Sequence, residues 1–504
     1  MTLSHVLLSL APLLSAQDLP QAEPAPEPAV EAAAEQAADD VSVTQHTLTI
    51  AGHELAYTAR AGTLALREED GTEKARLFYI SYTRDDVEDL ATRPVTFCFN
   101  GGPGSSSVWL HLGMLGPRRV RLEPEGWAPP PPYALEDNPE SWLDRTDLVF
   151  IDPVTTGYSR AAKGEDDGQF HGVQEDVRWV AEFIRLWTTR NLRWGSPKFL
   201  AGESYGTTRA AALSDHLQER HGMFLNGIVL ISAILEFQTA RFDVGNDLPY
   251  VLFLPTYTAA AWYHKQLEPE LQADLAATLA EAEAFAGGEY AAALFKGSRL
   301  SPEERERVLA KLGRFTGLPL NYLDRADLRV EIGRFCKELL RDERRTVGRL
   351  DGRFLGIDRD AVGEDYEYDP SYSAILGPFG GALNDYLRRE LGYESDLPYE
   401  ILTGRVQPWK MGDRNSYLNV AESLRRAMTR NPHLEVFVAA GYYDFATPYF
   451  AARYTFDRIG LDPTLADNVR FAFYEAGHMM YIHAPSRAAM KRDVDAFYAD
   501  VLAR

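Results

Sequence analysis

The sequence has few cysteines and fewer basic than acidic residues, and each of these shortages excludes a class of protein. Only two cysteines, Cys98 and Cys336, occur among 504 residues. They are too few for a disulfide framework, and no disulfide is expected between them. The 52 Lys and Arg residues against 74 Asp and Glu residues give a formal net charge of −22. Binding of nucleic acid needs clustered positive charge, so nucleic acid is not an expected partner.

The sequence also lacks a hydrophobic run long enough to cross a membrane. Residues 6–16 are mostly apolar but too short for a membrane span. Because Leu14-Ser15-Ala16 offers a cleavage site, residues 1–16 are expected to be a signal peptide, although no Lys or Arg precedes the apolar part. Residues 17–43 are rich in Ala, Pro and Glu, with seven acidic residues and no basic one, which predicts a disordered tether. The expected location is therefore periplasmic or secreted.

The pentapeptide Gly202-Glu203-Ser204-Tyr205-Gly206 fits the pattern Gly-x-Ser-x-Gly and lies between two expected elements. Residues 198–201 predict a short apolar strand, and residues 207–219, rich in Ala and Leu, predict a helix. A tight strand-to-helix turn exposes the serine hydroxyl above a sheet, and flanking glycines permit the strained backbone. An α/β-hydrolase presents its nucleophile in this way, so Ser204 is the candidate nucleophile. The pattern also arises by chance, and the hypothesis therefore needs partner residues.

Two partners follow in the chain order that this fold requires, which is Ser, then Asp or Glu, then His. Asp444 comes just after the apolar strand predicted at residues 435–441, and His478 comes shortly after the one at residues 471–474. Functional side chains of open α/β sheets gather at the carboxyl ends of the strands. A buried aspartate fixes the tautomer of the imidazole, which then accepts the serine proton. The order and the placement predict a catalytic triad of Ser204, Asp444 and His478.

A glycine-rich loop, residues 100–107, follows the strand predicted at residues 95–99. Acyl transfer develops an oxyanion, and backbone N–H groups can reach it where glycine leaves no side chain in the way. We expect the N–H groups of Gly102 and Tyr205 to form this oxyanion hole. The alternative, a phosphate-binding loop, is not favoured because the Gly-Lys-Ser/Thr ending of such loops is missing.

Four motifs together resemble the serine carboxypeptidase family (peptidase family S10). They are Asn100-Gly-Gly-Pro-Gly-Ser-Ser-Ser107, Asp152-Pro-Val-Thr-Thr-Gly-Tyr-Ser159, Gly202-Glu-Ser-Tyr-Gly206 and Gly477-His478. The resemblance runs from about residue 77 to the C-terminus. It implies an α/β-hydrolase fold and the release of C-terminal residues from peptides, usually at acid pH. It also implies that Asn100 and Glu203 bind the terminal carboxylate of the substrate, for which the two carboxyl groups must share a proton.

The chain departs from the family pattern at several positions. Ser105 replaces the cysteine of the family's glycine loop, and Thr155 stands where glycine is usual. Many members carry an acidic residue two positions before a later Gly-Pro, and this chain has Met114 there, so one carboxyl group is missing near the expected carboxylate site. Because no disulfide is expected, the chain differs from the eukaryotic secreted members, and this difference indicates a bacterial-type member.

The expected fold class is α/β, an α/β-hydrolase fold with a mostly helical cap insertion. Alternating patterns at the start of the folded part predict antiparallel strands. Helical and charged sequence then fills residues 239–397, which we interpret as an insertion that caps the catalytic edge. The core would comprise residues 44–238 and 398–504. The predicted strands not yet named are residues 45–50, 55–60, 75–82, 147–151 and 228–232, and the clearest helices are residues 173–192, 268–286, 301–311 and 484–502.

The sequence therefore predicts a serine-type carboxypeptidase that acts on peptides with a free C-terminus through an acyl-enzyme. Neither a metal nor an organic cofactor is implied. An esterase or acyltransferase of the same fold is the main alternative, and a non-catalytic binding protein is a second one. The preferred side chains around the scissile bond, the physiological substrate and the oligomeric state stay open.

Overall fold

The computed structural model describes residues 40–412 and 415–503, which belong to one compact unit. The expected signal peptide and nearly all of the expected tether lie outside the described residues. The end of the tether does not, because strand β1 spans Val41–Ile50 and pairs antiparallel with β2 (His53–Arg67) from Val41 opposite Gly62 onward. The prediction that the tether reaches residue 43 is therefore wrong. The β-branched residues at 41 and 43 continue the strand and share its ladder.

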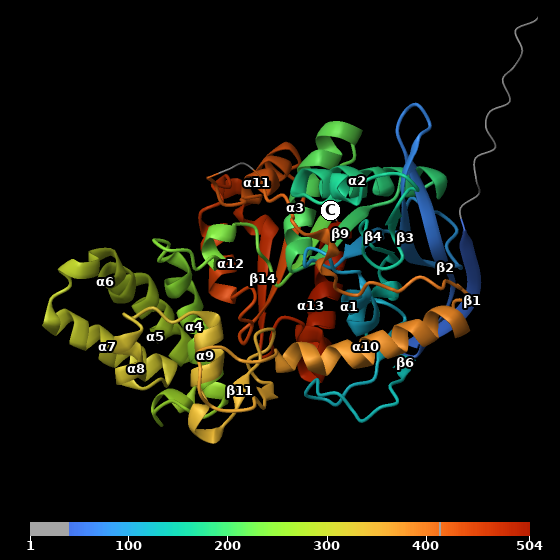
Figure 1. Cartoon of the computed structure of the whole chain (residues 1–504). Coiled ribbons are helices and arrows are strands. Elements are labelled where there is room, and N and C mark those ends of the chain that lie inside the picture. Colours follow the sequence, from blue (N-terminus) through green and yellow to red (C-terminus); the bar gives the residue numbers. More distant parts are fainter. Residues whose placement is uncertain (1–39, 413–414, 504) are drawn as a thin grey trace, which may run out of the picture. The chain divides into compact units, whose positions relative to one another are not determined.

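A ten-stranded mixed sheet forms the core (Figure 1). Its order is β1-β2-β3-β7-β4-β9-β10-β13-β14, and the short β8 pairs with β3. The pairs from β1 to β7 are antiparallel, as predicted for the start of the sheet, and those from β7 to β14 are parallel. The parallel strands thus end at one common edge. The strands are β3 (Glu73–Arg84), β4 (Val95–Phe99), β7 (Asp147–Ile151), β8 (Arg160–Ala161), β9 (Lys198–Glu203), β10 (Gly227–Ile231), β13 (Glu435–Gly441) and β14 (Val469–Tyr474).

Helices cover both faces of the sheet and bury the central strands completely. Helices α2 (Val173–Arg190), α3 (Tyr205–His221) and α11 (Ala421–Arg430) form one hydrophobic core with one face. Helix α13 (Ala484–Leu502) packs in the core of the opposite face. Strands buried on both sides read as continuous apolar runs, which explains why β4, β7, β10 and β13 were predictable.

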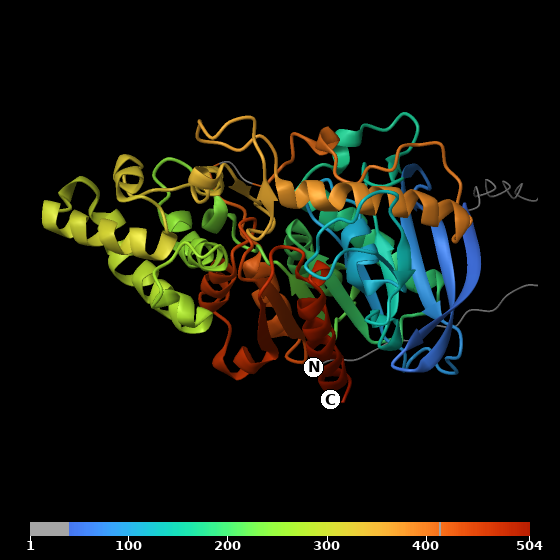
Figure 2. The ribbon, with the colours of Figure 1, turned by 90° about the horizontal axis from the view of Figure 1, so that it is seen from below.

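The predicted insertion lies between β10 and β13. Helices α4 to α9 surround a hydrophobic core of their own, and α10 returns to lie along the first half of the sheet (Figure 2). The expected helix over residues 268–286 is interrupted, because Asp274 caps a new helix by accepting a hydrogen bond from the Ala277 N–H at 3.0 Å. The helices are α4 (Leu248–Tyr263), α5 (Leu275–Phe285), α6 (Ala291–Lys296), α7 (Pro302–Thr316), α8 (Leu320–Arg325), α9 (Ile332–Glu338) and α10 (Pro370–Arg389).

Short elements complete the fold. Two small antiparallel pairs stand apart from the main sheet, and two helices border the expected catalytic edge. They are β5 (Arg118–Val120) with β6 (Leu135–Asp137), β11 (Thr346–Val347) with β12 (Leu355–Gly356), α1 (Val108–Leu110) and α12 (Tyr449–Asp457). Both cysteines are buried and free, Cys98 in β4 and Cys336 in α9. Among the described helices, none combines the length and apolar character needed to cross a membrane.

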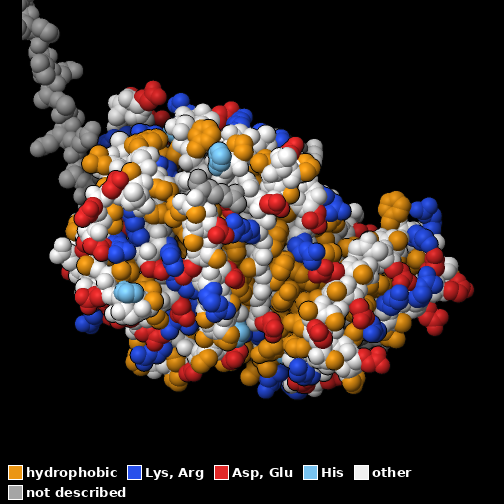
Figure 3. Space-filling view, turned by 180° about the vertical axis from the view of Figure 1, so that it is seen from behind, with side chains coloured by type: hydrophobic (Ala, Val, Ile, Leu, Met, Phe, Trp, Pro, Cys, Tyr) orange, Lys and Arg blue, Asp and Glu red, His pale blue; other side chains and the backbone are white. Residues whose placement is uncertain are grey.

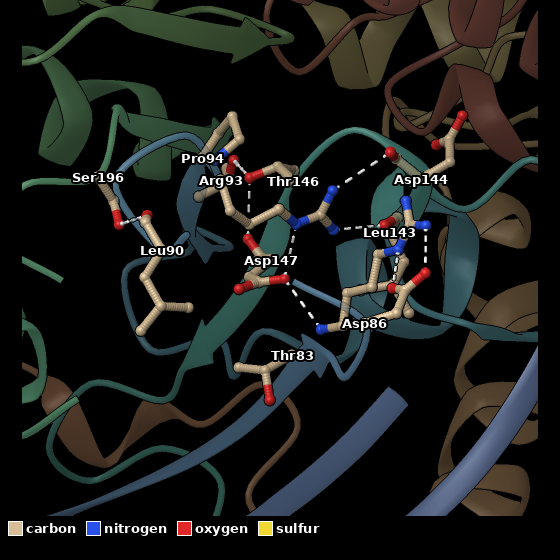
Figure 4. A network of polar contacts seen from close by, with 12 residues as sticks. Thr83, Asp86, Leu90, Arg93, Pro94, Leu143, Asp144, Thr146, Asp147 and Ser196 are labelled. Carbon is tan, nitrogen blue, oxygen red and sulfur yellow. Dashed lines mark hydrogen bonds and ion pairs between the residues drawn. The ribbon is translucent and has the colours of Figure 1, made fainter. Parts of the chain in front are cut away.

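A buried polar network joins the amino ends of β4 and β7, opposite the edge where the parallel strands end (Figure 4). The Asp147 carboxylate accepts hydrogen bonds from Arg93 Nε at 3.0 Å and from Arg193 Nη1 at 2.5 Å. Arg93 also donates to the backbone carbonyls of Leu143 and Asp144. Each charge is therefore paired, which is what burial of charge requires.

Acidic and basic side chains are interspersed over the face seen in Figure 3, and no continuous field of Lys and Arg gathers on that face. This distribution agrees with the formal net charge of −22.

Candidate active site

The predicted site residues meet in one cavity of about 370 Å³ at the carboxyl edge of the sheet. Six of the seven line it: Asn100, Gly102, Glu203, Ser204, Tyr205 and His478. The seventh, Asp444, is fully buried and contacts His478 from behind. Residues from β4, β9, β13 and β14 thus converge although they are far apart in the sequence, because these strands end at the same edge.

Ser204 connects β9 to α3 in a strained backbone conformation, with φ 59° and ψ −129°. A non-glycine residue adopts positive φ only where the surroundings enforce it. Two glycines allow this turn: a Cβ at Gly202 would lie 2.3 Å from the Gly206 carbonyl oxygen, and one at Gly206 would lie 2.7 Å from that of Phe99. The spacing of the pentapeptide thus follows from the close approach of strand, turn and helix.

His478 and Asp444 are joined by a hydrogen bond of 2.8 Å between Nδ1 and Oδ2. The Asp444 carboxylate also accepts the N–H groups of Ala446 and Thr447 and the Thr447 hydroxyl, at 2.7, 3.0 and 2.7 Å. These donors satisfy the acceptor oxygens of the buried side chain. Burial alone would lower the pKa of His478, but Asp444 and then Glu203 raise it above the ordinary value.

The backbone of His478 is held by two other segments. Its N–H donates to the Leu350 carbonyl at 2.6 Å, and its carbonyl accepts the Ser232 hydroxyl at 2.7 Å. The preceding Gly477 N–H donates to Asp351 Oδ2 at 3.0 Å. Leu350 and Asp351 belong to the predicted insertion, which therefore supports the histidine. The sequence contained no signal for this contact.

Glu203 is buried beside Ser204 and is bound by two donors. Asn100 Nδ2 donates to Oε1 at 3.0 Å, and the Tyr481 hydroxyl donates to Oε2 at 2.5 Å. Burial raises the pKa of Glu203 to about 7, because these hydrogen bonds and the nearby His478 offset only part of the desolvation. A carboxyl group with this pKa can carry a proton near neutral pH and can donate it to a second carboxylate.

Tyr481 was missed by sequence reasoning. It lies in a short turn, Met480–Ile482, three residues after His478, and nothing in the sequence identifies which side chain of this turn reaches Glu203. Gly113 is an indirect sign of the position of Tyr481, because a Cβ at Gly113 would lie 2.3 Å from the Tyr481 ring. The contact between Tyr481 and Glu203 can be recognised only when the positions of both segments in the fold are known.

The glycine loop lies directly against the first turn of α3. A Cβ at Gly101 would stand 2.4 Å from the Tyr205 nitrogen, and Gly102 has φ 101°. As the first residue of α3, Tyr205 has no intrahelical acceptor for its N–H. Arg209, which was also missed, fixes the loop from below: Nη1 donates to the Asn100 carbonyl at 2.6 Å and Nε to buried Asp176 at 2.7 Å.

The structure shows which residues surround the three positions that depart from the family pattern. Met114 is fully buried in the core and does not line the cavity. Thr155 adopts φ 77°, the left-handed region that glycine favours, and its hydroxyl lies 2.9 Å from His171 Nε2. Ser105 lines the cavity and accepts a hydrogen bond from Trp109 Nε1 at 2.9 Å. In the part of the chain that the structure describes, no group of three or more His, Cys, Asp or Glu residues is placed to hold a metal ion.

The serine turn between β9 and α3, with an aspartate after β13 and a histidine after β14, defines an α/β-hydrolase fold that brings these three residues to one edge of the sheet. This is the predicted fold class. Comparison with protein families then shows that residues 52–273 match the model described as serine carboxypeptidase. The match covers somewhat less than half of the chain, which over that range is similar to serine carboxypeptidases. The match begins before residue 77, where the sequence motifs had placed the start of the resemblance.

Each curated relative matches only part of this chain, and the matched part is less than half of the relative's own length. Pheromone-processing carboxypeptidase KEX1 of Saccharomyces cerevisiae is 34% identical over 114 residues, 22% of this chain and 14% of that protein. Serine carboxypeptidase-like 44 of Arabidopsis thaliana is 28% identical over 227 residues, 43% of this chain and 42% of that protein. The crystal structure of the KEX1 enzyme superposes with a TM-score of 0.54 at 16% identity, covering 88% of this chain and 91% of the other, which shows a common fold.

Proposed function

We propose that this chain is a serine-type carboxypeptidase that hydrolyses the C-terminal residue of peptides through an acyl-enzyme. The observation that supports it best is the buried Glu203, held by Asn100 and Tyr481 beside Ser204. Ester hydrolysis requires no such group. A protonated carboxyl next to a nucleophile, at the wall of a substrate-sized cavity, fits the terminal carboxylate of a peptide.

The proposed reaction starts with proton transfer from the Ser204 hydroxyl to His478. Because Nδ1 of His478 faces Asp444 at 2.8 Å, the neutral tautomer carries its proton on Nδ1 and presents Nε2 as the base. Ser204 attacks the carbonyl of the last peptide bond, and the N–H groups of Gly102 and Tyr205 stabilise the oxyanion. The amine leaves with the proton from His478, and water then attacks the acyl-enzyme by the same route.

The test compares N-blocked dipeptides that have either a free or an amidated C-terminus. We expect amidation to lower kcat/KM by at least about 30-fold, since the buried polar groups of Asn100, Glu203 and Tyr481 would be left poorly paired. Equal rates on acid and amide would contradict the proposal and favour an esterase or a general amidase. Efficient transfer to an added alcohol with little hydrolysis would instead favour an acyltransferase.

We also infer that the chain is exported, on the basis of the apolar segment and cleavage site at residues 6–16. Expression of the full chain in a Gram-negative host should give a periplasmic product that starts at Gln17. N-terminal sequencing of the fractionated protein would measure this. A cytoplasmic product that retains residues 1–16 would contradict the inference.

A further inference from the structure

The order of the strands divides the cavity into two sides around Ser204. Ser204 follows β9, which lies between β4 and β10 in the sheet. Asn100 follows β4, so the candidate carboxylate site opens on the β4 side. The connection after β10 supplies Ile234, Phe237, Ala240 and Arg241 to the cavity wall on the other side. If a peptide places its terminal carboxylate at Asn100, the residue on the acyl side of the scissile bond lies toward β10.

The side chains on the two sides differ in chemistry. Trp109 and Tyr372, whose rings are 6.2 Å apart, together with Ile375, form an apolar wall near the glycine loop. Two arginines, Arg241 and Arg349, line the cavity as well. The Phe445 N–H donates to the Arg349 carbonyl at 3.1 Å, which places Arg349 beside the connection after β13, the neighbour of β10.

Neither of these two guanidinium groups forms an ion pair with a carboxylate of the described residues. Arg241 is exposed, and its guanidinium group lies over the Phe237 ring at 5.8 Å. Glu236 is near Arg241 in the sequence, but the positive charge that acts on its carboxylate is that of Arg458. The Asp369 carboxylate accepts backbone N–H groups from the segment of Arg349, including that of Arg349 itself at 3.1 Å. By contrast, Arg209 and Arg353, which are buried near the cavity, each pair with an aspartate.

We infer that Arg241 and Arg349 select peptides whose penultimate residue, on the acyl side of the scissile bond, is Asp or Glu. This inference rests on the proposed function. Glu203, the one acidic residue among the described residues that line the cavity, is hydrogen-bonded to Asn100 and Tyr481 on the side of the leaving residue. A side-chain carboxylate on the acyl side would therefore meet two positive charges, and among the described residues no Asp or Glu lines that side of the cavity. Guanidinium groups bind carboxylates through paired N–H donors, so a carboxylate is the group that fits.

The experiment measures kcat/KM for N-blocked dipeptides that end in Leu and carry Glu, Gln, Leu or Lys as the penultimate residue. At about pH 6.5 a Glu side chain is ionised. We expect the Glu peptide to be cleaved about tenfold faster than its Gln isostere, since a hydrogen bond to a charged group contributes more than a neutral one. This ratio should shrink as NaCl is raised to about 1 M, because exposed charges are screened.

Arg241→Gln and Arg349→Gln should each lower the Glu-to-Gln ratio, and the double variant should bring it close to one. Arg299→Gln, a change at an exposed arginine outside the cavity, is the matched control and should leave the ratio as in the wild type. Labelling of Ser204 by a fluorophosphonate verifies that each variant is folded. A wild-type ratio at or below one, or a ratio that the double variant retains, overturns the inference while peptide cleavage still supports the proposed function. If no peptide is cleaved, the proposed function fails first.

Discussion

Ser204, His478 and Asp444 differ in how much their loss should cost. Ser204→Ala removes the attacking oxygen, and Asp444→Asn leaves the geometry but presents His478 with the wrong hydrogen-bonding partner. We expect kcat to fall by about 10⁶-fold for the first and about 10⁴-fold for the second, as in enzymes whose triads act as a unit. Steady-state assays with a free-acid dipeptide measure both. Turnover at the wild-type rate by folded Ser204→Ala would contradict the assigned role.

Glu203 determines the expected pH dependence of peptide binding. Its pKa is raised to about 7, so it is protonated below that pH and can donate to the substrate carboxylate. As pH rises through about 7 the proton is lost, two carboxylates face each other, and KM for peptides should rise. His478 must be neutral to act as a base, which limits kcat on the acid side. The optimum for kcat/KM should therefore lie on the acidic side of neutrality.

Glu203→Gln tests this dependence directly. The amide donates a hydrogen bond at any pH, so the rise of KM at alkaline pH should disappear for peptides. Because Glu203 is already neutral below its pKa of about 7, its replacement by the neutral amide should leave the acid limb of kcat near its wild-type position. An ester without a free carboxylate is the control, since its KM should not depend on Glu203. Identical pH profiles for peptide and ester in the wild type would refute the role of Glu203.

At the scale of single elements, the loop after β14 is positioned by a contact that only glycine permits. A Cβ at Gly477 would lie 2.4 Å from Cβ and 2.5 Å from Cα of Asp351. Gly477→Ala should displace His478, and a misplacement of about 1 Å can cost on the order of 100-fold in kcat. Gly288→Ala is the matched control, because nothing lies within 4 Å of its Cβ. Equal kcat in both variants would show that the contact does not position the histidine.

Elements of the sheet core were more predictable than those of the insertion. Strands such as β4 and β10 are buried on both faces, so their sequences are uninterrupted apolar runs. The helix predicted over residues 268–286 is broken because capping at Asp274 competes with helix continuation, and periodicity alone does not resolve that competition. The start of β1 at Val41 was missed because acidic composition next to it dominated the interpretation.

The site was predictable to the extent that each residue sits in a local motif. Ser204 and Asn100 lie in continuous glycine-rich patterns, and His478 and Asp444 follow apolar strands in the expected chain order. Tyr481, Asp351 and Arg209 contact the site across large sequence separations and belong to no local pattern. Their roles depend on tertiary packing, so a single sequence does not contain a signal for them.

At the scale of the whole molecule, the buried network around Asp147 at the amino edge of the sheet should contribute to stability and not to catalysis. Asp147→Asn leaves two buried arginines without their counter-charge and should lower the free energy of unfolding by about 3–5 kcal/mol. Asp86→Asn breaks the exposed pair with Arg84 in the same region (Figure 4) and should cost less than about 1 kcal/mol. Denaturant unfolding measures both changes.

Because this network lies at the edge opposite the cavity, kcat/KM per folded molecule should be the same in both variants and in the wild type. Activity assays under conditions where each variant is folded provide the comparison. A large loss of activity in folded Asp147→Asn would show that the amino edge of the sheet is coupled to the site.

The insertion has a further consequence for redesign. Leu350 and Asp351 hold the loop of His478, while Arg349, Tyr372 and Ile375 from the same insertion form the wall of the cavity. Grafting a foreign cap onto this scaffold to change its substrate would remove the support of the histidine together with the old wall. A graft that keeps residues 349–353 in place should retain turnover, whereas one that exchanges them should not. Substrate range and turnover therefore cannot be exchanged independently of each other in this fold.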